Sequence, residues 1–163
     1  MQVLCSSAHP ELEPAARDWL SRLGDRVVEA HPLAGQVQVV LTDDGEIRRL
    51  NAAYRAADTA TDVLSFSYSD GLLLPPGAEE AVLGEVYISL ERAAVQAAEQ
   101  GVPLLAECAR LMVHGLLHLA GYEHDAEPEM QAMERETDAM LVLAAAPAAG
   151  AAPRSPAPGR PSP

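Results

Sequence analysis

The chain has 163 residues, 48% of them hydrophobic and only 4% aromatic, which predicts one domain with a core of Leu, Val, Ala and Met. The formal net charge of -13 excludes a protein that grips nucleic acid mainly through a basic surface. The apolar runs are too short for a membrane span and no signal-peptide core follows Met1, so we expect a soluble, cytoplasmic protein with no membrane partner.

Two regions differ in composition. Residues 144–163 contain six prolines, eight alanines and two glycines, which predicts a disordered tail because such a segment cannot bury a core. Residues 1–143 hold all 24 acidic residues and nine of the 11 arginines, so their charge is 9 minus 24, or -15. We therefore expect one folded domain over residues 1–143.

The first third of the chain predicts a helix, a strand and a second helix. Apolar residues recur at helical spacing over residues 10–24, and Gly24 follows the last turn. Residues 36–41 alternate and predict a strand. Acidic residues then follow Thr42, which predicts a short helix with Thr42 as its N-cap.

The middle of the chain predicts two strands and a helix. Residues 62–68 place Leu64, Phe66 and Tyr68 on one apolar face of a strand. Residues 70–80 are rich in Gly and Pro and predict a loop. Residues 83–89 form the next expected strand, and a helix over residues 90–101 is expected to end at Gly101.

Two more helices complete the domain. The first begins near Pro103 and ends at Gly121, and the last follows Asp125, a candidate N-cap, over residues 126–143. Strands and helices interleave, so we expect an α+β fold: a mixed sheet of about four strands covered by helices, with a metal site on a central helix.

The rare residue types also predict positions. Trp19 and Phe66 are expected in the core as its largest members. Cys5 and Cys108 lie far apart in sequence, and we interpret both as small buried hydrophobic residues rather than a disulfide framework.

Residues 113–125 hold three of the chain's five histidines, at His114, His118 and His124. On a helix, the first two project from the same face, one turn apart. Gly121 lets the chain leave the helix through a conformation that is costly for other residues, so His124 can return toward the same point.

Three imidazoles at this spacing predict a metal site, because buried imidazoles need polar partners and the neighbouring leucines offer none. One Zn2+ ion per chain is the natural choice for imidazole, with nickel, copper and iron as other possible ions. Three protein ligands leave one position open, as catalytic zinc requires. The alternative is that these are ordinary core or surface histidines.

Metzincin proteases use the same spacing, with a glutamate beside the first histidine as general base. Here that position is Gly115. A zinc-dependent peptidase is therefore an alternative that lacks its base.

Three segments occur in order: LNAAYRAADTATDVLSFSY (50–68), LGEVYIS (83–89) and HGLLHLAGYEH (114–124). They closely resemble motifs of the bacterial YbeY family, zinc-dependent single-strand-specific endoribonucleases also known as rRNA maturation factors. The resemblance covers most of residues 36–143. Departures are mild: Glu85 and Glu123 replace aspartates, and Ser67 replaces a proline.

The resemblance implies an endoribonuclease that acts on single-stranded rRNA, in 16S 3′-end maturation and ribosome quality control. By position it implies that His114, His118 and His124 hold zinc and that Arg55 lines the same cleft. An arginine suits such a site because its planar fork can hold a phosphate. Considered alone, Arg55 is more simply interpreted as a solvated helix end, and only the resemblance favours the site. Asp62 either orients Arg55 or a histidine, or caps its strand.

The acidic body predicts weak binding to naked RNA, so we expect a ribosomal protein or assembly factor to deliver the substrate. The same acidity, and the lack of an evident general base, favours an alternative function: a ribosome-assembly binding module with a structural zinc.

Overall fold

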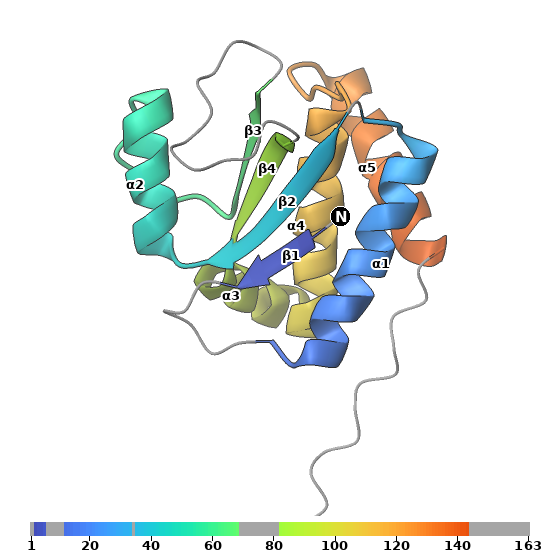
Figure 1. Ribbon diagram of the computed structural model, residues 1–163, viewed down its shortest axis with the longest axis horizontal. Helices are drawn as coiled ribbons and strands as arrows, with labels where there is room; N and C mark the ends of the chain where they lie inside the picture. The colour runs from blue at the N-terminus through green and yellow to red at the C-terminus, as the bar shows by residue number, and fades with distance from the viewer. Residues whose placement is uncertain (1, 6–11, 34, 69–81, 144–163) are drawn as a thin grey trace, which may run out of the picture.

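The computed structural model describes residues 2–5, 12–33, 35–68 and 82–143, and Figure 1 shows a twisted sheet with helices on both of its faces. The predicted loop at 70–80 and the predicted tail at 144–163 lie outside the described residues. In chain order the elements are β1 (Gln2–Cys5), α1 (Pro14–Ala30), β2 (Gln36–Thr42), α2 (Asp44–Arg55), β3 (Val63–Ser67), β4 (Val82–Ser89), α3 (Leu90–Gln100), α4 (Leu104–Leu119) and α5 (Glu127–Leu143). The predicted α+β class is confirmed.

The four strands lie in the order β1-β2-β4-β3. The pairs β1–β2 and β2–β4 are parallel, whereas β3 is antiparallel to β4, so the sheet is mixed. Sequence patterning located β2, β3 and β4 but not β1, which is only four residues long. β3 lies at one edge of the sheet, with Ser65 opposite Val86 of β4.

One face of the sheet carries the larger core. Val37, Val39 and Leu41 of β2 point to this face with Val86 and Ile88 of β4. Helices α1 and α4 pack over them, and α5 packs against α4 and α1. The alternation of apolar and polar residues that predicted β2 arises because every second side chain is buried beneath the helices.

A smaller cluster fills the other face, where α2 lies (Figure 1). Ile47 and Leu50 of α2 pack there on Leu64 and Phe66 of β3, with Tyr87 of β4 at the margin. The predicted apolar face of residues 62–68 is therefore the face that α2 covers. Phe66, like Trp19 in the larger core, is buried as predicted.

Helix α4 is the central helix of the larger core. Arg110, His114 and His118 share one half-buried side of the helix. The buried residues are Glu107, Cys108, Ala109, Leu111, Met112, Val113, Gly115, Leu116 and Leu117. The prediction for Cys108 is confirmed, whereas the side chain of Cys5 lies outside the described residues. No single described helix is long and apolar enough to cross a membrane; α3 and α4 pass such a test only as a pair, bent by 114° at their junction.

The first predicted helix ends later than expected. Gly24 does not terminate α1, which continues to Ala30 with Gly24 and Val27 both buried. A glycine inside a helix is destabilising by roughly 1 kcal/mol relative to alanine, but burial of the following turn against the core outweighs that propensity.

Two predicted helix caps were wrong by one residue. Asp43, not Thr42, caps α2, because its Oδ1 accepts a hydrogen bond of 2.6 Å from the backbone N–H of Glu46 while Thr42 is the last residue of β2. At α5 the carbonyl of Ala126, not Asp125, accepts the first helical hydrogen bonds. Gly101 does end α3 as predicted, with a left-handed φ of 65°.

Candidate metal centre

The end of α4 directs His124 back toward the helix. The N–H of Gly121 donates to the carbonyl of His118 at 3.0 Å, and the N–H of Tyr122 donates to the carbonyl of Leu117 at 3.0 Å. This pair of bonds is the Schellman helix ending, which needs a left-handed residue at its centre. Gly121 supplies it with a φ of 94°. The predicted role of Gly121 is thus confirmed.

The three predicted histidines meet at one point. One ligand nitrogen from each of His114, His118 and His124 lies within 4.8 Å of the other two. The Nε2 atoms of His114 and His118 are 3.2 Å apart, and the ring of His124 lies 4.7 Å from that of His118 and 5.7 Å from that of His114, centre to centre. The first two rings are half-buried and the third is exposed, so the cluster opens toward solvent.

A backbone carbonyl fixes the orientation of one imidazole. Nδ1 of His118 lies 2.9 Å from the carbonyl oxygen of Tyr122, an acceptor only, so Nδ1 carries the proton and donates. The neutral ring then presents the lone pair of Nε2 to the cluster. This arrangement is the usual support of a metal-binding histidine.

Burial favours the neutral form of His114 and His118. The pKa of His114 is lowered to about 4, mainly by burial and also by the positive charges of protonated His118 and His124. Burial and His124 also lower the pKa of His118. Because a metal competes with protons for the same lone pairs, rings that resist protonation at neutral pH are prepared to act as ligands.

The donor set fits a divalent transition metal. An ion held at about 2.0–2.1 Å by two nitrogens in tetrahedral geometry separates them by about 3.3 Å, which matches the 3.2 Å between the Nε2 atoms of His114 and His118. Three imidazole nitrogens with an open side match a catalytic rather than a structural zinc site, because a structural site has four protein ligands. The cluster is thus able to hold a metal ion.

Gly115 brings α4 into direct contact with the sheet. A Cβ atom at this position would lie 2.5 Å from Cγ1 of Val86 and 3.0 Å from Oγ of Ser65. The Ser65 hydroxyl donates to the Gly115 carbonyl at 3.2 Å, which joins β3 to the helix beside His114. The glutamate of the metzincin pattern has no room here, so packing accounts for its absence.

A cavity of about 920 Å³ opens beside the histidines, between β3, the end of α2 and the segment that joins them. Its wall includes the three histidines and Arg55, so the structure brings together all four predicted site residues. Nη2 of Arg55 donates to the carbonyl of Ser65 at 2.9 Å, and its guanidinium carbon lies 5.6 Å from the centre of the Phe66 ring.

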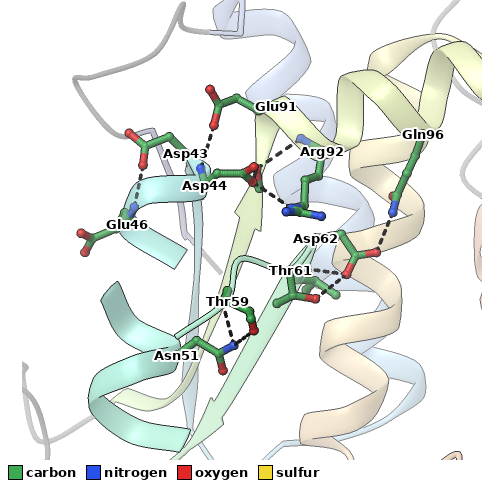
Figure 2. A network of polar contacts seen from close by, with 12 residues as sticks. Asp43, Asp44, Glu46, Asn51, Thr59, Thr61, Asp62, Glu91, Arg92 and Gln96 are labelled. Atoms are coloured by element: carbon green, nitrogen blue, oxygen red, sulfur yellow. Dashed lines mark hydrogen bonds and ion pairs between the residues drawn. The ribbon is translucent and has the colours of Figure 1, made fainter. Parts of the chain in front are cut away.

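Asp62 forms hydrogen bonds within the cavity wall and does not orient Arg55. Its Oδ1 accepts from the N–H of Val63 at 2.9 Å, which caps the start of β3, and its Oδ2 accepts from Nε2 of Gln96 in α3 at 3.0 Å (Figure 2). Of the two roles predicted for Asp62, the strand cap is the one observed. Its negative charge also acts on His114, where it opposes the lowering of the pKa.

Asn51 is a site residue that sequence patterning missed. Its buried amide donates to the carbonyl of Thr59 at 2.9 Å and so holds the segment between α2 and β3 in the cavity wall (Figure 2). The signal was available, because a polar residue at position 51 lies four residues after Ile47 on the apolar face of α2.

A second, smaller cavity of about 530 Å³ reaches His114 and His124 from the side of α5. Arg110 lines it, but this arginine is paired with the buried carboxylate of Glu107 at 2.6 Å, and Glu134 and Asp138 make the remaining wall acidic. The cavity that contains Arg55 is therefore the one suited to an anionic ligand.

The chain is similar to known proteins over most of its length. The family model for endoribonuclease YbeY matches residues 5–144. The chain is 41% identical over 145 residues to endoribonuclease YbeY of Pelotomaculum thermopropionicum, covering 86% of this chain and 95% of that protein. It is 38% identical over 148 residues to the protein of that name from Desulforamulus reducens, with the same coverage.

A solved structure shares the fold. The solution structure of TM1509 from Thermotoga maritima superposes with a TM-score of 0.60 at 26% identity, covering 88% of this chain and 87% of that one. With the family model matching most of the chain, the fold, the sequence similarity and the histidine cluster lead to one conclusion: this chain belongs to the YbeY endoribonuclease family.

Proposed function

We propose that this protein is a zinc-dependent endoribonuclease that cleaves single-stranded RNA at the cavity beside the three histidines. One observation carries the proposal: three imidazole nitrogens converge within a cavity whose wall also holds the guanidinium of Arg55. A metal ion and an arginine facing the same space suit a phosphodiester, whose reaction develops negative charge on phosphate oxygens.

Each residue has a definite task in this proposal. His114, His118 and His124 hold the ion, and the Tyr122 carbonyl keeps Nε2 of His118 turned toward it. Bound zinc supplies Lewis-acid activation of a phosphate oxygen or of water. Arg55 uses one N–H to hold the Ser65 carbonyl, which leaves other N–H groups of its planar fork for the phosphate.

The charge of the chain bears on how RNA reaches the site. A formal net charge of -13 repels a polyanion, so we propose that a ribosomal protein or assembly factor delivers the substrate in the cytoplasm. The substrate proposed is rRNA, with 16S 3′-end maturation and ribosome quality control as the processes served.

The test is cleavage of single-stranded RNA by zinc-loaded protein, with a chelator-treated sample and a His114→Ala variant beside it. We expect cleavage in the loaded protein alone. Undiminished cleavage by His114→Ala would place the activity elsewhere. Analysis of product ends separates two routes, because attack by the RNA 2′-hydroxyl leaves a cyclic phosphate and attack by water does not.

The acidic body supports a second candidate, a ribosome-assembly module in which zinc only holds the turn after α4. That candidate fails if chelation abolishes RNA cleavage while thermal stability and partner binding stay almost unchanged. A peptidase is disfavoured by Gly115, where the sheet leaves no room for a glutamate base, and absence of turnover of a peptide library would dismiss it.

A further inference from the structure

Tyr54 is an exposed aromatic side chain in the wall of the cavity that holds the histidines. The chain has one Trp, one Phe and four Tyr. Among these, Tyr54 is the exposed large aromatic of the described residues, with 46% of its surface accessible. The other aromatic side chain in that wall, Phe66, is only 6% accessible. The exposed side chain of Tyr54 therefore lies at the proposed cleavage site.

The ring of Tyr54 is held in place on one side. Its centre lies 5.4 Å from that of Phe66 with the two planes at 62°, an edge contact that stabilises this orientation of the ring. Phe66 is held in turn by Tyr87, at 6.0 Å, and by the guanidinium of Arg55, at 5.6 Å. The ring of Tyr54 is thus packed on one side and accessible on the other.

We infer that Tyr54 is the platform of a nucleobase-binding subsite, on which a base next to the scissile phosphate of single-stranded RNA stacks. The inference rests on the proposed function. Arg55 is the next residue along the chain and lines the same cavity, so a phosphate at Arg55 carries its own base into the neighbourhood of Tyr54. A cavity of about 920 Å³ is large for a phosphate group alone.

Stacking suits this protein for two physical reasons. It uses the π-face that every base possesses and needs no positive charge, so an acidic chain can bind RNA this way without a basic groove. A base within a duplex is already stacked and paired and cannot turn onto the ring without unpairing. A platform at Tyr54 therefore gives selectivity for single strands without selectivity for sequence.

The test uses an oligoribonucleotide with one cleavage site and derivatives in which single nucleotides beside that site lack their base. Three variants are compared with the unsubstituted protein: Tyr54→Leu, which keeps an apolar side chain but no π-face, Tyr54→Phe, which keeps the ring, and Val95→Ala. Val95 is an exposed residue of α3 outside the cavity and is the control.

One base is expected to matter in the unsubstituted protein, where its removal lowers kcat/KM by roughly 5- to 150-fold, the range of a base–aromatic stack. Tyr54→Leu loses a similar factor on intact RNA and shows no further loss on the abasic substrate. Tyr54→Phe and Val95→Ala keep the abasic penalty. An equal abasic penalty in Tyr54→Leu and in the unsubstituted protein overturns the inference.

Failure of this inference and failure of the proposed function give different results. If cleavage depends on His114 but the abasic penalty is the same with and without the Tyr54 ring, the stacking inference fails and the proposed function stands. If the protein cleaves no RNA, the same comparison is made by equilibrium binding of a 2′-deoxy oligonucleotide with and without each base. In that case the proposed function fails. The inference about Tyr54 is still tested, because it requires that removal of one base weakens binding to the unsubstituted protein but not to Tyr54→Leu.

Discussion

Nδ1 of His118 lies 2.9 Å from the carbonyl oxygen of Tyr122, four residues further along the chain. The peptide that holds this imidazole thus belongs to the turn that leaves α4 and brings His124 back to the cluster. Two of the three histidines depend on one turn, and that turn depends on the left-handed conformation of Gly121. Its geometry therefore governs both the position of His124 and the tautomer of His118.

Replacing Gly121 by alanine should weaken metal binding as well as stability. A Cβ would meet nothing within 4 Å, so the penalty is the left-handed backbone, about 1–2 kcal/mol. We expect a reduced free energy of unfolding in urea and a higher dissociation constant for Zn2+ by calorimetry. Gly101→Ala is the matched control, because Gly101 ends α3 with a φ of 65° and also has open space around it. Equal zinc affinities in the two variants would contradict the role given to the turn.

Single replacement of a cluster histidine should reduce zinc affinity sharply. Loss of an outer hydrogen-bond partner lowers affinity by roughly 10- to 100-fold, and loss of a ligand exceeds that. His118→Ala removes the ring that both approaches His114 and is held by Tyr122. Val95→Ala is the control, since Val95 is an exposed residue of α3 that lines neither cavity beside the histidines. Comparable zinc dissociation constants for the two variants would remove His118 from the ligand set.

Alanine at position 115 should destabilise the fold although alanine is the better helix former. The added methyl would meet Val86 at 2.5 Å, and forcing such a group into a packed core costs about 1–3 kcal/mol. Urea unfolding of Gly115→Ala, Val86→Ala and the double variant measures this. We expect the double variant to be more stable than the sum of the single effects predicts, because Val86→Ala makes the space. If the two single effects on the free energy of unfolding simply add, the contact between position 115 and Val86 is not the cause of the destabilisation.

Stability of the chelator-treated protein should fall as the medium becomes acidic. The folded protein keeps His114 neutral because its pKa is lowered to about 4, whereas the unfolded chain protonates it near the ordinary value of 6.5. Between these values the unfolded state binds more protons, so the free energy of unfolding decreases as pH falls from about 6.5 to 4. Urea unfolding at several pH values should show a smaller decrease for His114→Asn than for the unsubstituted protein. Parallel curves would exclude His114 as a source of this dependence.

Loss of the Arg55 guanidinium should slow RNA cleavage with little effect on zinc affinity. Removing one donor to a developing oxyanion lowers kcat by roughly 100- to 1,000-fold. Arg55→Ala is compared with Arg48→Gln, a change on the same helix at an exposed arginine that pairs with Asp58 outside the cavity. Single-turnover cleavage rates give the readout. A rate for Arg55→Ala that equals that of Arg48→Gln would assign Arg55 to the solvated helix end.

The sequence alone determined the parts of this protein that depend on near neighbours. The convergence of His114 and His118 follows from the helical repeat, and the return of His124 follows from the conformational freedom of Gly121. The alternation in β2 and the apolar face of β3 likewise reflect strand geometry, which repeats every two residues. These features need only local backbone rules, so they could be predicted without a structure.

Only the tertiary structure decided which distant residues share the cavity and where packing overrides the local conformational preference of a residue. Arg55 lines the same cavity as the histidines because β3 pairs antiparallel to β4 beneath α4 and the Ser65 carbonyl of β3 accepts a hydrogen bond from the guanidinium. Gly24 stays inside α1 because the next turn is buried, and Gly115 excludes a side chain because the sheet lies against it. Contacts between segments far apart in the chain depend on the packing of whole elements, and no local pattern in the sequence encodes that packing by itself.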